Sequence, residues 1–293
     1  VEYVKPMTAD LGDFELIEMP PNSQGATAIL MKKILDQFDL RNLDPLSADR
    51  VHIEAEAAKL AYGARNRLIG DPHFYKFNME DFCSEEIVLD MASKIDPTAA
   101  SNQDIGTNEN THKDTVYLTV VDKSRCMVSL IFSIFNSFGS GYASEKLGLL
   151  FHNRGAGFTL EKDHPNELMG GKRPLHTIIP AFFKKQDEFT MSFGVMGGQY
   201  QATGHARLIS NIIDYGMDIQ TAIDFPRSFP EEGYLKLEDG YSDLIAVELE
   251  RKGHKILRPN QPIGGAQAII CNDITGTLIG GSDPRKDGCA LGY

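Results

Sequence analysis

The sequence contains no tryptophan, and it has no apolar run of about 18 residues, the length that indicates a transmembrane helix. We therefore expect no membrane span. A secretory signal, with its basic start and short apolar segment, is also missing. The chain begins at Val1 rather than at methionine, so we expect it to be part of a longer gene product, and its compartment, cytoplasmic or exported, is not predicted.

Basic clusters are scarce as well. The 29 lysines and arginines are outnumbered by 41 aspartates and glutamates, the net charge is -12, and the longest basic runs are pairs such as Lys32-Lys33. This excludes a nucleic-acid partner, because phosphate binding needs clustered positive charge. The four cysteines form no CxxC pair, and neither a metal-ligand set nor a phosphate loop is apparent. No cofactor and no metal are therefore expected.

The chain divides at residues 96–114, a polar stretch without hydrophobic periodicity that we interpret as a mobile linker. Before this stretch, apolar residues recur at helical spacing and predict helices over residues 26–38, 49–68 and 84–95. A change from helices to strands at one linker indicates two consecutive parts of the chain.

After the linker, β-branched and aromatic residues predict strands over residues 115–121 and 126–135, which form a hairpin with apolar side chains on both faces and hence both faces buried. Further patterns predict strands over residues 189–195, 243–249, 266–271 and 276–280 and helices over residues 204–215 and 219–223. This order predicts an α+β fold in which a sheet is packed with helices in layers.

Thr115 is the first residue of a predicted strand and follows the polar linker directly. If the Asp114–Thr115 bond is cut, Thr115 gains a free α-amine beside its own hydroxyl. Such an amine, with a pKa near 8, can accept the hydroxyl proton and activate the oxygen as a nucleophile. By spacing alone this indication is weak, because a threonine at the start of a strand is usually explained by its β propensity.

Several segments, in order along nearly the whole chain, resemble the gamma-glutamyltranspeptidase family. In the second part these segments are residues 115–122, 136–141, 172–175, 196–198, 264–267 and 281–285, and in the first part they are residues 18–22 and 52–62. By this resemblance, residues 1–114 are the C-terminal part of a large subunit, residues 115–293 are a small, catalytic subunit, and the two together form one domain.

The resemblance implies an N-terminal nucleophile hydrolase with a four-layer αββα sandwich. Members cut their own precursor before a threonine, form an acyl-enzyme on that threonine and pass the acyl group to water or an amine. The implied partners are a small-molecule amide substrate and the two subunits of one precursor, and a homo-oligomer is left open. Thr111-His112 superficially resembles the Thr-x-His of many members, but only Thr115 heads the strand.

Other roles follow by position in the family pattern. Ser133 falls where members have a second hydroxyl that hydrogen-bonds the nucleophile; the alternative is a strand serine bonded to backbone. Gly197 and Gly198 match the glycine pair whose N–H groups resemble an oxyanion hole, since glycine lets backbone donors approach closely. The alternative for this pair is a tight turn after a strand. Tyr117 replaces the commoner histidine.

The substrate pocket departs from the gamma-glutamyl-specific members. There a glutamine and an aspartate hold the substrate's α-amino group, and this sequence has Arg154 and Gly157 at those places. An ammonium favours a carboxylate, and Arg154 offers the opposite charge. We therefore expect an acyl group that bears a carboxylate or another anion, which Arg154 pairs bidentately. The alternative for Arg154 is a structural salt bridge.

The same pocket differs at three further positions. His176 and Thr177 stand where those members have two serines, and both are candidate substrate-binding residues. Phe135 replaces an expected asparagine two residues after Ser133, but Asn136 follows at once and is a candidate in its place. His152 and His205 are interpreted as packing or surface histidines, because an N-terminal nucleophile supplies its own base.

We therefore expect a self-processing amidohydrolase or acyltransferase with Thr115 as nucleophile, similar to the glutaryl-type cephalosporin acylase or oxamate amidohydrolase branch of the family. One alternative is a true gamma-glutamyl transferase or glutathione hydrolase, against which Gly157 argues. Another is an inactive fragment, since a member's large subunit also contributes an arginine that lies before this segment.

Overall fold

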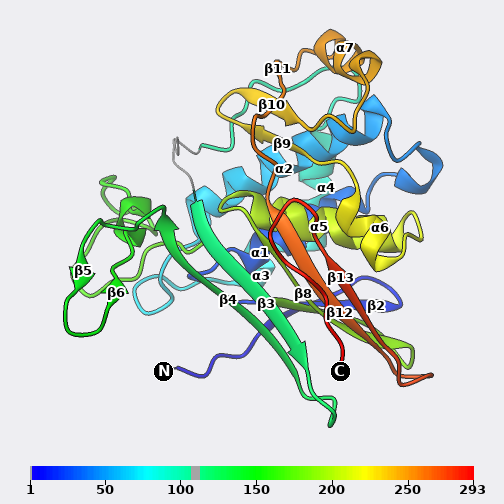
Figure 1. The fold of residues 1–293 in the computed structure, drawn as a ribbon. Coiled ribbons are helices and arrows are strands. Elements are labelled where there is room, and N and C mark those ends of the chain that lie inside the picture. The colour runs from blue at the N-terminus through cyan, green and yellow to red at the C-terminus, as the bar shows by residue number, and fades with distance from the viewer. Residues whose placement is uncertain (1, 107–112) are drawn as a thin grey trace.

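The computed structural model describes residues 2–106 and 113–293. Six strands form one antiparallel sheet in the order β1-β2-β7-β8-β12-β13 (Figure 1). The strands are β1 Met7–Asp10, β2 Phe14–Glu18, β7 Ala181–Lys185, β8 Phe189–Met196, β12 Gly265–Asn272 and β13 Leu278–Ser282. Because β2 pairs with β7, the sheet joins the first residues of the chain to its second half.

Helices cover one face of this sheet, and the main hydrophobic core lies between these helices and the sheet. They are α1 Gly25–Leu35, α2 Ala48–Leu68, α3 Met79–Cys83, α4 Glu85–Ser93, α5 Tyr200–Ile213 and α6 Ile219–Asp224. Helix α1 is buried along ten of its residues, as expected for a helix that is apolar nearly all round. Helix α2 begins after Ser47, whose side chain accepts a hydrogen bond from Arg50 N. Within the described ranges, none of the helices is both long enough and apolar enough to span a bilayer.

The opposite face of the sheet carries a hairpin of β3 Lys113–Val121 and β4 Met127–Asn136 (Figure 1). Tyr117 lies flat on Gly194 of β8, where an added Cβ would be 2.5 Å from the ring. Neighbouring residues of a strand point to opposite faces, and Phe193 accordingly contacts His205 of α5, with ring centroids 4.6 Å apart. Helices, sheet and hairpin are thus three successive layers, and the predicted α+β fold is confirmed.

The expectation that both faces of the hairpin are buried is wrong. Alternate residues point away from β8 into solvent, and all of them are apolar: Val116, Leu118, Val120, Val128, Leu130 and Phe132. The most exposed of these is Phe132, at 56%. Only the face that carries Thr115 and Tyr117 packs against the sheet. The continuous apolar composition therefore did not reveal that one face has no neighbour among the described residues.

A second small cluster contains an element that the sequence analysis assigns incorrectly. Residues 243–249 form part of a helix, α7 Asp243–Arg251, and not a strand. Ser242 caps this helix by accepting a hydrogen bond from Ile245 N, and Leu249 is its buried anchor. The helix packs beside a three-stranded sheet of β9 Ser228–Glu231, β10 Tyr234–Leu237 and β11 Ile256–Leu257. The short strands β5 Ala143–Ser144 and β6 Leu149–Leu150 pair separately.

Candidate active site

Thr115 and Ser133 lie directly opposite each other in the β3–β4 hairpin, so their side chains share one face. Thr115 Oγ1 donates a hydrogen bond to Ser133 Oγ at 3.0 Å. The strand pairing is irregular between Asp114 and Thr115, which is the peptide bond that the sequence analysis selects for self-cleavage. The structure thus brings the predicted nucleophile and the predicted second hydroxyl into contact.

Arg154 lies next to this hydroxyl pair, in the short 3-10 helix η2 Arg154–Gly157. Its side chain is buried, with 2% exposed. One nitrogen, Nη2, donates to Ser133 Oγ at 3.1 Å, and Nη1 donates to Thr177 Oγ1 at 2.9 Å. The guanidinium stacks on the ring of Phe135 at 4.0 Å from its centroid, and Phe135 N donates to Ser133 Oγ at 3.0 Å.

Contacts between the hairpin and β8 show how the strand of Thr115 runs over the sheet. Thr119 Oγ1 donates to Ser192 Oγ at 2.7 Å, and Tyr117 covers Gly194. One step of two residues along β3 thus matches a step of two in the opposite direction along β8, toward its last residue, Met196. Met196 packs with Tyr117 and Ile131 of the hairpin and immediately precedes the predicted oxyanion glycines.

Gly197 and Gly198 form the turn between β8 and α5. Their φ angles are 128° and 58°, a region that side-chain-bearing residues rarely adopt. An added Cβ on Gly197 would be 2.8 Å from the Cα of Gly264, so the turn needs glycine for close approach as well. The turn leads into the N-terminus of helix α5, where the helix dipole favours negative charge.

Gln24 connects the Arg154 side of the site to the glycine turn, and sequence reasoning missed it. Its Nε2 donates to the carbonyl oxygen of Thr177 at 2.8 Å and to that of Gly198 at 3.3 Å. Its Oε1 accepts a hydrogen bond from Arg65 Nη1 at 2.7 Å. Partners more than 150 residues apart leave no spacing signal, so only the fold could reveal this link.

His176 and Asn136, two candidate substrate-binding residues, border this network. Burial, together with the positive charge of Arg154, lowers the pKa of His176 to about 3, so its imidazole is neutral. Its Nδ1 accepts a hydrogen bond from Ile178 N at 3.3 Å. Asn136 lies at the end of β4, and its buried Oδ1 finds no hydrogen-bond partner within the described ranges.

The remaining residues considered as candidates are the pair Thr111 and His112 and the two histidines His152 and His205. Thr111 and His112, the competing pair, lie outside the described residues. His152 is exposed, and its Nδ1 accepts a hydrogen bond from Arg154 N at 3.1 Å. His205 is fully buried between Glu18 Oε1, at 2.7 Å from its Nδ1, and Val195 N, which donates to its Nε2 at 3.2 Å. Both histidines thus serve local structure.

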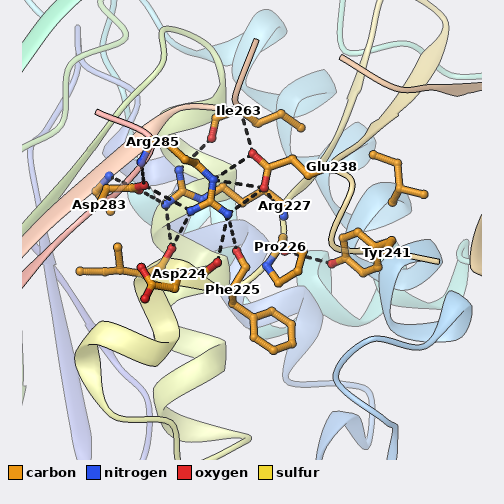
Figure 2. Close-up of polar contacts among 12 residues, drawn as sticks. Asp224, Phe225, Pro226, Arg227, Glu238, Tyr241, Ile263, Asp283 and Arg285 are labelled. Atoms are coloured by element: carbon orange, nitrogen blue, oxygen red, sulfur yellow. Dashed lines mark hydrogen bonds and ion pairs between the residues drawn. The ribbon is translucent and has the colours of Figure 1, made fainter. Parts of the chain in front are cut away.

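Figure 2 shows Asp283 and Arg285 of the C-terminal motif together with Arg227 and Ile263. Ile263 precedes Gly264, the residue whose turn packs on Gly197. Asp283 Oδ2 accepts a hydrogen bond from Ala266 N at 2.8 Å and forms an ion pair with Arg227. Arg227 Nη1 donates to the carbonyl of Ile263 at 2.8 Å, on the other side of Gly264. This buried ion pair therefore fixes both ends of the Gly264 turn.

Comparison with known proteins identifies the family of this chain. Residues 1–293 match the gamma-glutamyltranspeptidase family, and the chain belongs to that family. It is 32% identical to the glutathione hydrolase-like YwrD proenzyme of Bacillus subtilis (strain 168), over 99% of this chain and 56% of that protein. It is also 32% identical to the oxamate amidohydrolase proenzyme of Klebsiella pneumoniae, over 98% of this chain and 55% of that protein.

Among solved structures, the chain is similar to the cephalosporin acylase from Bacillus halodurans. The TM-score is 0.88 at 34% identity, over 100% of this chain and 54% of that chain. The fold is thus that of the N-terminal nucleophile hydrolases, as the sequence resemblance implied. The chain spans about half the length of the relatives that it matches.

Proposed function

We propose that this chain is part of a self-processing amidohydrolase in which Thr115 becomes an N-terminal nucleophile. The observation that carries the proposal is the contact of Thr115 Oγ1 with Ser133 Oγ, which Arg154 and Phe135 N also hold. Arg154 and Phe135 N fix the position of Ser133 Oγ, and its contact with Thr115 Oγ1 orients the nucleophile before a substrate arrives.

Self-cleavage between Asp114 and Thr115 is supported by the irregular strand pairing at this bond. Two relatives are also named as proenzymes. Residues 1–114 and 115–293 would remain associated after cleavage, because β2 pairs with β7 and α1 packs on α5 within the same core. We accordingly propose that they are parts of a large and a small subunit of one domain.

The proposed reaction uses groups of this chain alone. After cleavage, the α-amine of Thr115 accepts the proton of Oγ1 while Oγ1 attacks the amide carbonyl carbon. The carbonyl oxygen becomes an oxyanion, which the N–H groups of Gly197 and Gly198 stabilise at the N-terminus of α5. The C–N bond then breaks, the amine leaves with the proton, and water hydrolyses the Thr115 ester to release the acid. An acceptor amine in place of water would give transfer.

The substrate's acyl group would carry a carboxylate bound by Arg154. Thr115 Oγ1 and Arg154 Nη2 are both about 3 Å from Ser133 Oγ, so they are no more than about 6 Å apart. Only a few bonds can separate the attacked carbonyl from a carboxylate paired with Arg154. Short dicarboxylic monoamides of the oxamyl or glutaryl type fit this distance, and Thr177 and the neutral His176 would line the same side.

A gamma-glutamyl substrate is the second candidate, since one relative is named glutathione hydrolase-like. Its ammonium group would need a carboxylate close to the nucleophile. Arg154 and Gly157 supply a cation and no side chain at the two matching positions, which favours the first candidate. Asn136 Oδ1, a buried acceptor, is the group that would hold a substrate N–H in either case.

Mass spectrometry of the purified chain tests the proposal. Two fragments, the second beginning at Thr115, are expected from the wild type, and a single uncut chain from Thr115→Ala. Glutaryl, oxamyl and gamma-glutamyl amides should then be assayed with both proteins. Turnover by Thr115→Ala would rule out the mechanism, and an uncut, inert wild type would leave the alternative of an inactive fragment.

A further inference from the structure

Three potential metal ligands converge in a region of the molecule that the proposed reaction does not use. His52 and Glu56 are one turn apart on α2 and share a face of that helix. His254 lies just after α7, and its Nε2 is 2.8 Å from His52 Nδ1. One ligand atom from each of the three residues lies within 4.8 Å of the others, and all three side chains are buried.

The protonation of the two rings follows from the backbone around them. His52 Nε2 lies 2.7 Å from the carbonyl oxygen of Asp96, which can only accept, so Nε2 carries the proton. The lone pair of His52 Nδ1 therefore points toward His254. It accepts a hydrogen bond from the protonated Nε2 of His254.

We propose that His52, Glu56 and His254 bind one divalent transition-metal ion, of which zinc suits the two imidazoles and one carboxylate best. Tetrahedral zinc with bonds of about 2.0–2.1 Å places two ligand nitrogens roughly 3.3 Å apart. The two rings need to separate by only about 0.5 Å from their present 2.8 Å. The proton of His254 moves to its Nδ1, and the ion takes its place.

The surroundings of the three ligands match those of protein zinc sites. The bond from His52 Nε2 to the carbonyl of Asp96 is the type of second contact that orients a metal-binding histidine. Glu56 Oε2 accepts from Ser101 N at 3.1 Å, which fixes the carboxylate. A cavity of about 180 Å³ borders the cluster at His254 and is also lined by Lys59 and Ser101.

Lys59 is the group that opposes a cation here. Its Nζ lies 2.7 Å from Glu56 Oε1 and 2.9 Å from the carbonyl oxygen of Ser101, and it borders the cavity. If the ion binds at Glu56 Oε1, the ammonium group of Lys59 must move away from this oxygen, toward the carbonyl of Ser101 and the cavity. This competition distinguishes a metal site from a purely structural network. Removal of the Lys59 ammonium should increase the affinity for the metal ion if the residues form a metal site. It should weaken the polar network if the residues serve structure alone.

The bound ion would connect α2, the segment after α7 and residues 96–101. The carbonyl of Asp96 and the N–H of Ser101 already contact two of the three ligands. No spacing in the sequence indicates this site, because His254 is 202 residues away from His52. The proposal is independent of Thr115 and its chemistry.

Titration of the chelator-treated, full chain with Zn²⁺ and with Co²⁺ tests the proposal. One equivalent of Zn²⁺ should bind, and Co²⁺ should give the intense visible absorption of a four-coordinate ion. His254→Gln should weaken Zn²⁺ binding by about 100-fold or more, since loss of even an outer partner of a ligand costs 10–100-fold. Lys59→Gln should tighten it, and His73→Gln, at an exposed histidine, should leave it unchanged.

Circular dichroism of the metal-free variants shows whether each is folded, and the Co²⁺ spectrum of the wild type stands even if His254→Gln does not fold. Absence of saturable binding to the wild type would overturn the proposal. So would equal affinity of His254→Gln and wild type, or weaker binding by a folded Lys59→Gln.

Discussion

Thr115 and Arg154 donate hydrogen bonds to the same acceptor, the Oγ of Ser133, at 3.0 and 3.1 Å. The buried guanidinium of Arg154 is therefore separated from the proposed nucleophile, Thr115, only by the hydroxyl group of Ser133. In the proposed function this would connect orientation of the nucleophile with recognition of the substrate, because one serine oxygen contacts both groups.

We expect Ser133→Ala to lower kcat by about 100-fold, because misplacement of a reacting group by about 1 Å can cost that much. Ser133→Thr keeps the hydroxyl and should retain most of the activity. The measurement is kcat of the processed enzyme on a glutaryl or oxamyl amide, with the rate of self-cleavage followed by mass spectrometry. Equal kcat for Ser133→Ala and wild type would show that the serine only serves the fold.

The double variant Arg154→Gln/Gly157→Asp should shift specificity toward gamma-glutamyl amides. It restores the glutamine and aspartate of the gamma-glutamyl-specific members. The new side chain fits, because an added Cβ on Gly157 would be 3.6 Å from the carbonyl of Leu175, an ordinary contact. We expect the ratio of kcat/KM for gamma-glutamyl over glutaryl amides to rise by about 100-fold, because a missing charge partner is costly to a bound ion.

Arg154→Lys is the matched control for that experiment. Lysine keeps the positive charge but loses the planar, two-armed contact, so it should lower kcat/KM for carboxylate-bearing amides without favouring gamma-glutamyl amides. An unchanged preference in the double variant would show that Arg154 does not contact the substrate.

The sequence predicts the two strands that carry Thr115 and Ser133 well because the relevant pairs are local. Thr115 and Ser133 belong to one hairpin, whose β-branched residues favour strands. Residues 243–249 mislead because their apolar residues also suit a strand, and the cap at Ser242 that favours a helix is a single residue. Local patterns thus identify where elements lie better than which type they adopt.

Contacts between distant segments could not be predicted. Gln24 reaches Thr177 and Gly198 only after α1 packs against α5. A substrate role for Arg154 is an expectation from its place in the family pattern and its charge, and only the fold reveals its stacking on Phe135, whose φ is 75°. The family pattern indicates which residues are candidates for the site, and the fold shows which of these residues are in contact.

Loss of Asp283 should be strongly destabilising, because it leaves Arg227 buried without its ion-pair partner (Figure 2). Breaking such a buried pair costs about 3–5 kcal/mol of unfolding free energy. Asp283→Ala should show this loss in urea denaturation. Asp90→Ala, which removes an exposed ion pair with Lys94, should change stability by less than about 1 kcal/mol. Similar effects of the two variants would contradict the structural role of the C-terminal motif.

Acid should weaken the contact between Asp71 and Arg173, which holds the segment before His176. Burial opposes ionisation of Asp71, but hydrogen bonds from the Arg173 side chain and backbone outweigh it and lower the pKa of Asp71 to about 2. The folded state therefore binds this proton more weakly than the unfolded chain, whose aspartates have a pKa near 3.9. The stabilisation is complete above that value and is lost as the pH falls through about 2.

Asp71→Asn should accordingly be less stable than wild type at pH 6, by on the order of 1–2 kcal/mol, and the difference should disappear near pH 2. Urea denaturation at a series of pH values measures this, with Asp13→Asn, at an exposed turn, as the control that should match wild type at pH 6. A difference between Asp71→Asn and wild type that stays constant from pH 6 to pH 2 would show that Asp71 acts through its shape and neutral hydrogen bonds. A difference that shrinks over this range would assign the effect to the charge that Arg173 stabilises.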